Sequence, residues 1–590
     1  MVDLKAQPFN LDDEAIAWVR ETIAGMSLDE KIGQLFVNMG SSRTEEYLTG
    51  MLDNYHIGAV RYNPGPAEKI WEQNHILQTK SKIPLLIAAN TEAGGNGACT
   101  DGTYVGVEVK VAAGHDAKWA YELGRVSGVE ASAIGCNWSF APIVDVMRNW
   151  RNPIISTRSF ASDPDQVLEL SRAYMKGIME SGIMPAAKHF PGDGIDERDQ
   201  HLSASVNSLS CEEWDETFGK VYKGLIDDGL PSIMVGHIMQ PAYQRKFNPG
   251  MSDDDLLPAT LSKELITDLL RGQLGFNGLI VTDASHMVGM TGAMARRDIL
   301  PTAIAAGIDL FLFFNDPDED FQWMKEGYEK GVITEERLQE ALEHILGLKA
   351  RLGLHNTPRE EIMLPKDEAM AKIGLPENTA VGPELTDAAV TLVKNKQAEL
   401  LPISPEKTPR VLVIPASGAP NPLVRAFGGG GEKSHPADKL GEILESRGYA
   451  VTIHESLFDK LNAMSPEEQT ELVKNLYAGK APIANLTDNY DLVILVGKIN
   501  GLMQPVERVM WPSSKGTPDI PWYVFELPTI AISTSTPYML ADIPQVKTYI
   551  NAYDDKPYTL EAVADKLEGK SEFKGVSPVD AFCGMIDTRI

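Results

Sequence analysis

The sequence predicts an α/β protein of two domains. An N-terminal (β/α)8 TIM barrel is expected over residues 1–354 and a C-terminal α/β/α sandwich over 384–590, with a linker over 355–383. The chain has 590 residues, which is enough for two large domains. Short apolar runs alternate with amphipathic segments about eight times before residue 354, as a closed barrel needs. A second α/β alternation follows a stretch of scattered Pro, Gly and charge.

The first domain opens with a helical pattern over residues 10–40. Ser27 and Glu30 have the spacing of a capping box, in which each side chain accepts a hydrogen bond from the other residue's backbone N–H. Apolar residues then recur at helical spacing from Ile32 to Phe36. The barrel strands are expected near residues 34–39 and at 57–62, 83–90, 137–145, 184–190, 232–237, 278–284 and 309–314.

The second domain has its own series of apolar runs. Strands are expected at residues 410–416, 450–455, 490–497, 529–535 and 546–553. Helical segments between them indicate a doubly wound sandwich. The glycine run 428–431 indicates a loop.

Charge and composition exclude several classes of protein. Lys and Arg number 54 and Asp and Glu 83, a net charge of −29, which disfavours nucleic acid and anionic membranes as partners. The four cysteines form no CxxC pair and no HExxH or EF-hand pattern occurs, so neither metal nor cofactor is expected. The N-terminus has no signal-peptide pattern, and no apolar run approaches the ~20 residues of a membrane span. We therefore expect a cytoplasmic protein with reduced thiols.

One polar segment, residues 186–205, carries side chains suited to catalysis. Lys188 and His189 lie at the carboxyl end of an expected barrel strand, where catalytic residues of barrels collect. Asp199 precedes His201 by two residues, so its carboxylate can reach the imidazole, orient it and raise its pKa. A solvated loop with a chance Asp and His is the alternative.

A second segment ends in a carboxylate. Asp283 follows the apolar run 278–282 and is expected at the mouth of the barrel. From the residue type alone it could be a nucleophile, a metal ligand or a buried ion-pair partner.

Several ordered motifs resemble those of glycoside hydrolase family 3, particularly its NagZ-like β-N-acetylglucosaminidase branch. The resemblance covers nearly the whole chain. Its motifs are KHFPGDG at 188–194, DQH at 199–201, PATLS at 258–262, LR at 270–271, LGFNG at 274–278, TD at 282–283, FAPIVD at 140–145 and RSF at 158–160.

The resemblance implies a role for individual residues. Asp283 matches the nucleophile that forms a covalent glycosyl-enzyme, and His201 matches the acid/base, with Asp199 as its partner. Further matched positions would bind the sugar or wall its pocket: Arg158, Lys188, His189, His237 and Met287. The family's D-x-E-G-G motif reads Asn90 to Gly95 here with one extra residue, so either Asn90 or Glu92 would grip the outer sugar hydroxyls.

The residue types agree with retaining glycoside hydrolysis. The nucleophile must be an ionised carboxylate, and we expect Lys188 and Arg158 to lower the pKa of Asp283. The acid/base must give and take a proton, which a histidine such as His201 can do near neutral pH.

The resemblance therefore predicts an exo-acting retaining β-N-acetylhexosaminidase. It would release terminal β-GlcNAc from chitin- or peptidoglycan-derived oligosaccharides. The second domain would then mainly support structure or homodimer formation. Alternatives are a family 3 β-glucosidase, a β-N-acetylglucosaminide phosphorylase, whose histidine would repel phosphate less than a carboxylate would, and a non-catalytic sugar-binding protein.

Overall fold

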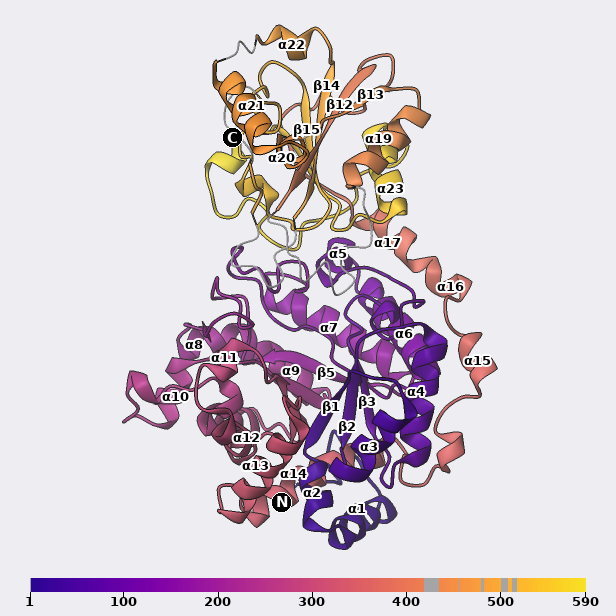
Figure 1. Ribbon diagram of the computed structural model, residues 1–590, viewed down its shortest axis with the longest axis vertical. Helices are drawn as coiled ribbons and strands as arrows, with labels where there is room; N and C mark the ends of the chain where they lie inside the picture. The colour runs from indigo at the N-terminus through magenta and orange to yellow at the C-terminus, as the bar shows by residue number, and fades with distance from the viewer. Residues whose placement is uncertain (1, 419–434, 456, 479–481, 500–507, 512–516) are drawn as a thin grey trace. The chain divides into compact units, whose positions relative to one another are not determined.

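The computed structural model describes residues 2–418, 435–455, 457–478, 482–499, 508–511 and 517–590 (Figure 1). The glycine run 428–431 lies outside these residues. Internal contacts divide the chain into two compact units. The first comprises Met1–Glu108, Asp116–Asn149 and Arg158–Gly382, and the second Val109–His115, Trp150–Thr157 and Pro383–Ile590. The three-part division at residues 354 and 383 stays a prediction.

The first unit contains the expected barrel. Eight parallel strands close in the order β1-β10-β9-β7-β5-β4-β3-β2, which confirms the predicted fold class. Their bounds are β1 Phe36–Gly40, β2 Ala59–Tyr62, β3 Leu86–Ala89, β4 Trp138–Ser139, β5 Met184–Phe190, β7 Ser232–Val235, β9 Leu279–Ala284 and β10 Leu310–Leu312. A separate parallel pair is formed by β6 (Ser205–Val206) and β8 (Ile238–Met239).

Helices follow or separate the barrel strands, as a (β/α)8 fold requires. They are α1 Asp13–Gly25, α2 Leu28–Gly33, α3 Glu45–Tyr55, α4 Ala67–Lys80, α6 Lys118–Ala133, α7 Pro164–Met179, α8 Cys211–Trp214, α9 Lys220–Asp227, α10 Pro241–Phe247, α11 Val288–Thr291, α12 Arg296–Ala306, α13 Pro317–Glu329, α14 Glu335–Arg351, α15 Lys366–Met370 and α16 Pro376–Thr379. Two helices, α5 (Glu108–Ala113) and α17 (Val381–Ala389), include a boundary between the units.

The expected helix over residues 10–40 ends earlier than predicted. The capping box of Ser27 and Glu30 is present and begins α2, but the helix ends at Gly33 and Phe36 begins strand β1. The backbone at Gly33 lies so close to the C-terminal end of α3 that a Cβ there would be 2.1 Å from the carbonyl oxygen of Tyr55. The apolar residues that continue the helical spacing after Gly33 are therefore buried at or just before strand β1, and not on a helix.

A buried ionic cluster fixes strand β9. The Oδ2 atom of Asp309 accepts hydrogen bonds from the Arg271 guanidinium at 2.8 Å and from the backbone N–H of Ile280 at 2.9 Å. Its other oxygen faces His344 and Arg337 of α14. Burial would raise the pKa of Asp309, but the charges of these three neighbours lower it below its usual value. The cluster ties the start of β9, whose far end carries Asp283, to α14.

The second unit is built on a six-stranded sheet in the order β11-β16-β15-β14-β12-β13. Its strands are β11 Thr391–Asn395, β12 Arg410–Ser417, β13 Ala450–Ile453, β14 Leu492–Lys498, β15 Thr529–Ser533 and β16 Thr548–Asn551. The sequence predicted all of these except β11, which pairs antiparallel with β16 at the edge of the sheet. Its five residues include Lys394 and Asn395, so its apolar run is short.

Both faces of this sheet are covered. Helices α19 (Pro436–Ser446) and α23 (Pro557–Leu567) pack on one face, and buried side chains that include Tyr523, Leu527, Met539, Leu540 and Ile543 cover the other. The remaining helices of the described residues are α20 Leu457–Asn462, α21 Pro466–Ala478 and α22 Ala484–Thr487. None of the helices in the described ranges combines the length and apolar character that a membrane span needs.

A buried ion pair holds residues 109–115 within the second unit. The Lys110 ammonium is fully buried and lies 2.6 Å from Asp554 Oδ2 and 3.3 Å from the Thr559 hydroxyl. Burial lowers the pKa of Lys110, and the charge of Asp554 opposes that shift. The backbone of Val576 also donates to the carbonyl oxygen of Ala113.

Candidate active site

The predicted site residues gather at the carboxyl ends of the barrel strands. Lys188 and His189 lie in β5, and Asp283 lies in β9. Glu92 follows β3 by three residues, and His237 follows β7 by two. Parallel strands bring their carboxyl ends to one edge, so positions far apart in the sequence meet there.

Glu92 is the carboxylate that contacts the predicted sugar-binding cations. Its oxygens accept two hydrogen bonds from Arg158, both 2.9 Å long, and one from Lys188 at 2.6 Å. Burial would raise the pKa of Glu92, but the charges of Arg158 and Lys188 lower it well below its usual range. Asn90, the other candidate, has a buried side-chain oxygen with no hydrogen-bond partner among the described residues. Of the two candidates, Glu92 is therefore the one that makes the ionic contact with Arg158 and Lys188.

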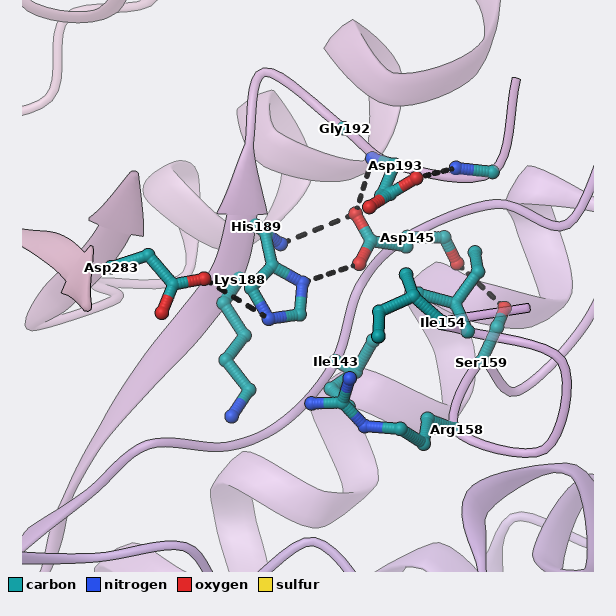
Figure 2. A network of polar contacts seen from close by, with 12 residues as sticks. Ile143, Asp145, Ile154, Arg158, Ser159, Lys188, His189, Gly192, Asp193 and Asp283 are labelled. Carbon is teal, nitrogen blue, oxygen red and sulfur yellow. Dashed lines mark hydrogen bonds and ion pairs between the residues drawn. The ribbon is translucent and has the colours of Figure 1, made fainter. Parts of the chain in front are cut away.

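Asp145 joins His189 to the start of the 191–205 loop. Its Oδ2 atom lies 2.7 Å from His189 Nδ1, and its Oδ1 atom accepts from the backbone N–H groups of His189 and Asp193. Figure 2 shows Asp145 and Asp283 on opposite sides of the His189 ring. His189 Nε2 lies 3.9 Å from Asp283 Oδ2.

Asp283 is held in its ionised form. Burial would raise its pKa, but the charges of His189, His237 and His201, together with the backbone N–H of Ala284, lower the pKa to about 2. The sequence predicted the low pKa but attributed it to Lys188 and Arg158. The largest contributions to the lowering come instead from the three histidines, although the charge of Arg158 also acts on Asp283.

His201 and Asp199 form the expected pair. His201 Nδ1 lies 2.7 Å from Asp199 Oδ1, which also accepts from the backbone N–H of His201 at 2.8 Å. Burial would lower the pKa of His201, but this hydrogen bond and the charges of Asp199 and Asp283 raise it above its ordinary value. The pair therefore keeps a proton on the imidazole to higher pH than a free histidine would.

Gln200, between these two residues, anchors the loop. Its amide oxygen accepts from the backbone N–H of His237 at 2.8 Å, and its amide nitrogen donates to Asp193 at 3.2 Å. Its backbone carbonyl accepts from the N–H of Gly289 in α11. Asp193 thus takes part in holding the loop.

His237 contacts the protein through both ring nitrogens. Nε2 donates to the carbonyl oxygen of Ala284 and Nδ1 accepts from the Thr260 hydroxyl, both at 3.0 Å. Burial lowers the pKa of His237 to about 4, so the ring is neutral near pH 7. Met287 is the N-cap residue of α11 and is 1% exposed; its backbone N–H donates to the carbonyl oxygen of Ala284, which His237 also contacts.

Sequence reasoning gave no role to three buried polar residues of the site. Asp145 could have been noticed, because it ends both the FAPIVD motif and the strand expected at residues 137–145. Gln200 and Glu108 carry no sequence signal. Glu108 accepts from the N–H of Ile143 at 2.9 Å, and burial raises its pKa well above the usual value. No group of three or more His, Cys, Asp or Glu side chains among the described residues is arranged to hold a metal ion.

Comparison with known proteins identifies the family. The profile described as "Glycosyl hydrolase family 3 N terminal domain" matches residues 27–348. A "Beta-N-acetylglucosaminidase/beta-glucosidase" of Cellulomonas fimi is 41% identical over 591 residues, and the match covers 100% of both chains. The chain belongs to glycosyl hydrolase family 3.

Solved structures of the family agree with this fold. "Beta-glucoside phosphorylase BglX" superposes on this family 3 enzyme with a TM-score of 0.89 and 39% identity, covering 99% of both chains. A family 3 β-N-acetylglucosaminidase of Paenibacillus sp. FPU-7 superposes with a TM-score of 0.74 and 24% identity, covering 94% of this chain and 99% of that one, and supports the fold alone. The protein is a glycoside hydrolase, and its substrates are carbohydrates.

Proposed function

We propose that this enzyme is an exo-acting, retaining β-N-acetylhexosaminidase that releases terminal β-GlcNAc from chitin- or peptidoglycan-derived oligosaccharides. The observation that carries the proposal is the combination, in one site, of an ionised Asp283 and a histidine hydrogen-bonded to Asp199. Retaining glycosidases need a carboxylate nucleophile and a group that can both donate and accept a proton.

In the first half of the proposed reaction, an Asp283 oxygen bonds to the anomeric carbon while the glycosidic C–O bond breaks. Because Nδ1 of His201 is engaged by Asp199, Nε2 gives its proton to the leaving oxygen. In the second half a water oxygen bonds to the anomeric carbon while the bond between that carbon and the Asp283 oxygen breaks. The water gives one proton to Nε2, so the Asp283 carboxylate and the protonated His201 are both regenerated.

The cationic pair on Glu92 would hold the sugar. Lys188 keeps donor hydrogens beyond the one used on Glu92, and Glu92 itself offers further lone pairs. Sugar hydroxyls both donate and accept, so they can join such a pair without separating it. His189 adds an adjacent ring nitrogen, which lies 3.9 Å from Asp283.

Phosphorolysis is the second candidate function. It is favoured by the similarity, over nearly the full length of both chains, to a protein titled as a β-glucoside phosphorylase. It has a physical basis too, because an imidazole repels an incoming phosphate less than a carboxylate acid/base would. The same glycosyl-Asp283 intermediate would then be released by phosphate instead of water.

Initial rates on an aryl β-N-acetylglucosaminide and an aryl β-glucoside, with and without inorganic phosphate, would test both proposals. Asp283→Ala serves as the control. A GlcNAc preference lost in the variant supports the hexosaminidase, and glycosyl phosphate formation supports the phosphorylase. A preference for the glucoside contradicts the hexosaminidase, and binding of GlcNAc without turnover indicates a non-catalytic protein. A cytoplasmic location and a homodimer stay predictions, which cell fractionation and analytical ultracentrifugation would check.

A further inference from the structure

Arg61 is a barrel residue that the proposed mechanism does not use. It is the third residue of β2 and lies opposite Met39 of β1 and Ala88 of β3. Residues paired across neighbouring strands share a face of the sheet, and successive residues alternate between faces. The orientation of Arg61 therefore follows from that of β1.

Strand β1 shows which face is the barrel interior. The Asn38 side chain donates to Tyr47 of helix α3, and the Phe36 ring packs 6.5 Å from Phe321 of helix α13, so both point outward. Met39 lies between these positions in the alternation and points inward. Its paired neighbour Arg61 therefore points into the barrel near the carboxyl ends of the strands.

Arg61 has no acidic partner within the described ranges. Its guanidinium donates to the Asn63 side chain at 2.6 Å and contacts Met39 Sδ at 3.6 Å. Burial lowers the pKa of Arg61, and the charges of Glu92 and Asp283 oppose that shift. An arginine nevertheless stays protonated in proteins. A partly buried cation without a carboxylate partner favours an anionic ligand.

The charge balance of the site changes during the proposed reaction. Glu92 is already shared by Arg158 and Lys188, so Asp283 is the other carboxylate whose charge acts on Arg61. When Asp283 becomes a glycosyl ester its charge disappears. The loss of that negative charge makes the surroundings of Arg61 more positive, so the site attracts an anion most strongly when the acceptor must enter.

We propose that Arg61 forms a binding position for a phosphate group inside this active site, an inference that rests on the proposed function. A guanidinium offers two parallel N–H groups that match two phosphate oxygens. The phosphate has two sources that share this chemistry: free inorganic phosphate, or a phosphate ester on the donor sugar.

With free phosphate the step balances without an added reactant. An oxygen of hydrogenphosphate bonds to the anomeric carbon, and the bond between that carbon and the Asp283 oxygen breaks. The products are a glycosyl phosphate, which keeps the hydrogenphosphate proton, and the Asp283 carboxylate. The two negative charges of hydrogenphosphate are divided between these products.

The test compares wild type, Arg61→Gln and Arg61→Lys. Arg172→Gln is the matched control, because Arg172 is an exposed arginine paired with Asp228 on outer helices. One arm measures turnover of a neutral aryl β-N-acetylglucosaminide and aryl β-glucoside with and without inorganic phosphate, with glycosyl phosphate followed by phosphorus NMR. The other arm measures the corresponding aryl 6-phosphoglycosides without added phosphate.

We expect one of the two phosphate responses in wild type. The measured quantity is the rate of the phosphate-dependent reaction divided by the rate on the neutral substrate without phosphate. In Arg61→Gln this ratio should fall about 10- to 100-fold, the range for a charge-assisted hydrogen bond. Arg61→Lys should keep part of it and Arg172→Gln all of it. The responding arm identifies the phosphate source.

Three results would overturn the inference. Arg61→Gln could keep the full phosphate response, or it could slow the phosphate-free reaction by the same factor, which would assign Arg61 to the sugar or to folding. Wild type could also respond to neither form of phosphate. If wild type responds to neither form but its turnover still depends on Asp283, only the phosphate inference fails and the proposed function is unaffected. If no turnover depends on Asp283, the proposed function is contradicted as well.

Discussion

Replacing Asp199 by Asn tests the electrostatic account of the acid/base. Asn has the same shape, and its amide oxygen can still accept from His201 Nδ1, so the ring keeps its position. What disappears is the negative charge that helps to raise the pKa of His201. The burial that lowers this pKa remains. The acid form of His201 should therefore be lost at lower pH than in wild type.

The size of the shift follows from the 2.7 Å contact between the two side chains. A hydrogen bond to a charged group contributes about 1.5–3 kcal/mol, and one pH unit corresponds to about 1.36 kcal/mol. The alkaline limb of the profile of kcat/KM against pH should move down by about one to two pH units. At pH values above both alkaline limbs, kcat/KM should then be about 10- to 100-fold lower than in wild type. This limb reports the free enzyme, in which His201 must be protonated to act as the acid.

The assay uses two aryl β-N-acetylglucosaminides with a good and a poor leaving group. The loss should be larger for the poor leaving group, because that oxygen needs the proton. Asp228→Asn, at an exposed carboxylate paired with Arg172, is the control and should leave the limb in place. An alkaline limb that does not move in Asp199→Asn would refute the account.

Three further predictions concern the carboxylates. Asp283→Asn should lower kcat by ~10³-fold or more. Mass spectrometry of this variant should detect no covalent adduct with a 2-fluoro glycoside. Because the pKa of Asp283 is about 2, any acid limb above pH 4 in the wild-type profile should belong to another group. Glu92→Gln removes the negative charge that Arg158 and Lys188 share, so it should raise KM and lower the free energy of unfolding in urea by about 2–4 kcal/mol. Asn90→Ala should leave KM nearly unchanged. Asp309→Asn should cost about 3–5 kcal/mol of unfolding free energy, and a loss below 1 kcal/mol would contradict the role of its cluster.

The features that could be predicted from the sequence are those that depend on residues close together in the chain. The barrel strands are short apolar runs, so their positions follow from composition and spacing. Asp199 and His201 are two residues apart, and their pairing needs no knowledge of the fold. The edge strand β11 was missed, because half-polar strands of five residues resemble loops.

The contacts between distant residues could not be predicted in this way. Glu92 meets Lys188 only because the barrel brings the ends of β3 and β5 together. The extra residue in the 90–95 segment left Asn90 and Glu92 as two candidates for holding the outer sugar hydroxyls. Asp145 accepts hydrogen bonds from donors 44 and 48 positions further along the chain, which no local pattern reveals. The histidines that contribute most to the low pKa of Asp283 were not recognised for the same reason.

The contact between Asp145 and His189 also fixes the tautomer of the His189 ring. An ionised carboxylate can only accept hydrogen bonds, so Nδ1 of His189 donates its hydrogen to a charged Asp145. The other ring nitrogen, Nε2, lies 3.9 Å from Asp283. In the proposed mechanism Asp283 would lose its charge on becoming an ester, and a neutral Nε2 would then accept a hydrogen bond from a sugar hydroxyl. Under that mechanism, the tautomer of one ring would link the covalent state of Asp283 to sugar binding.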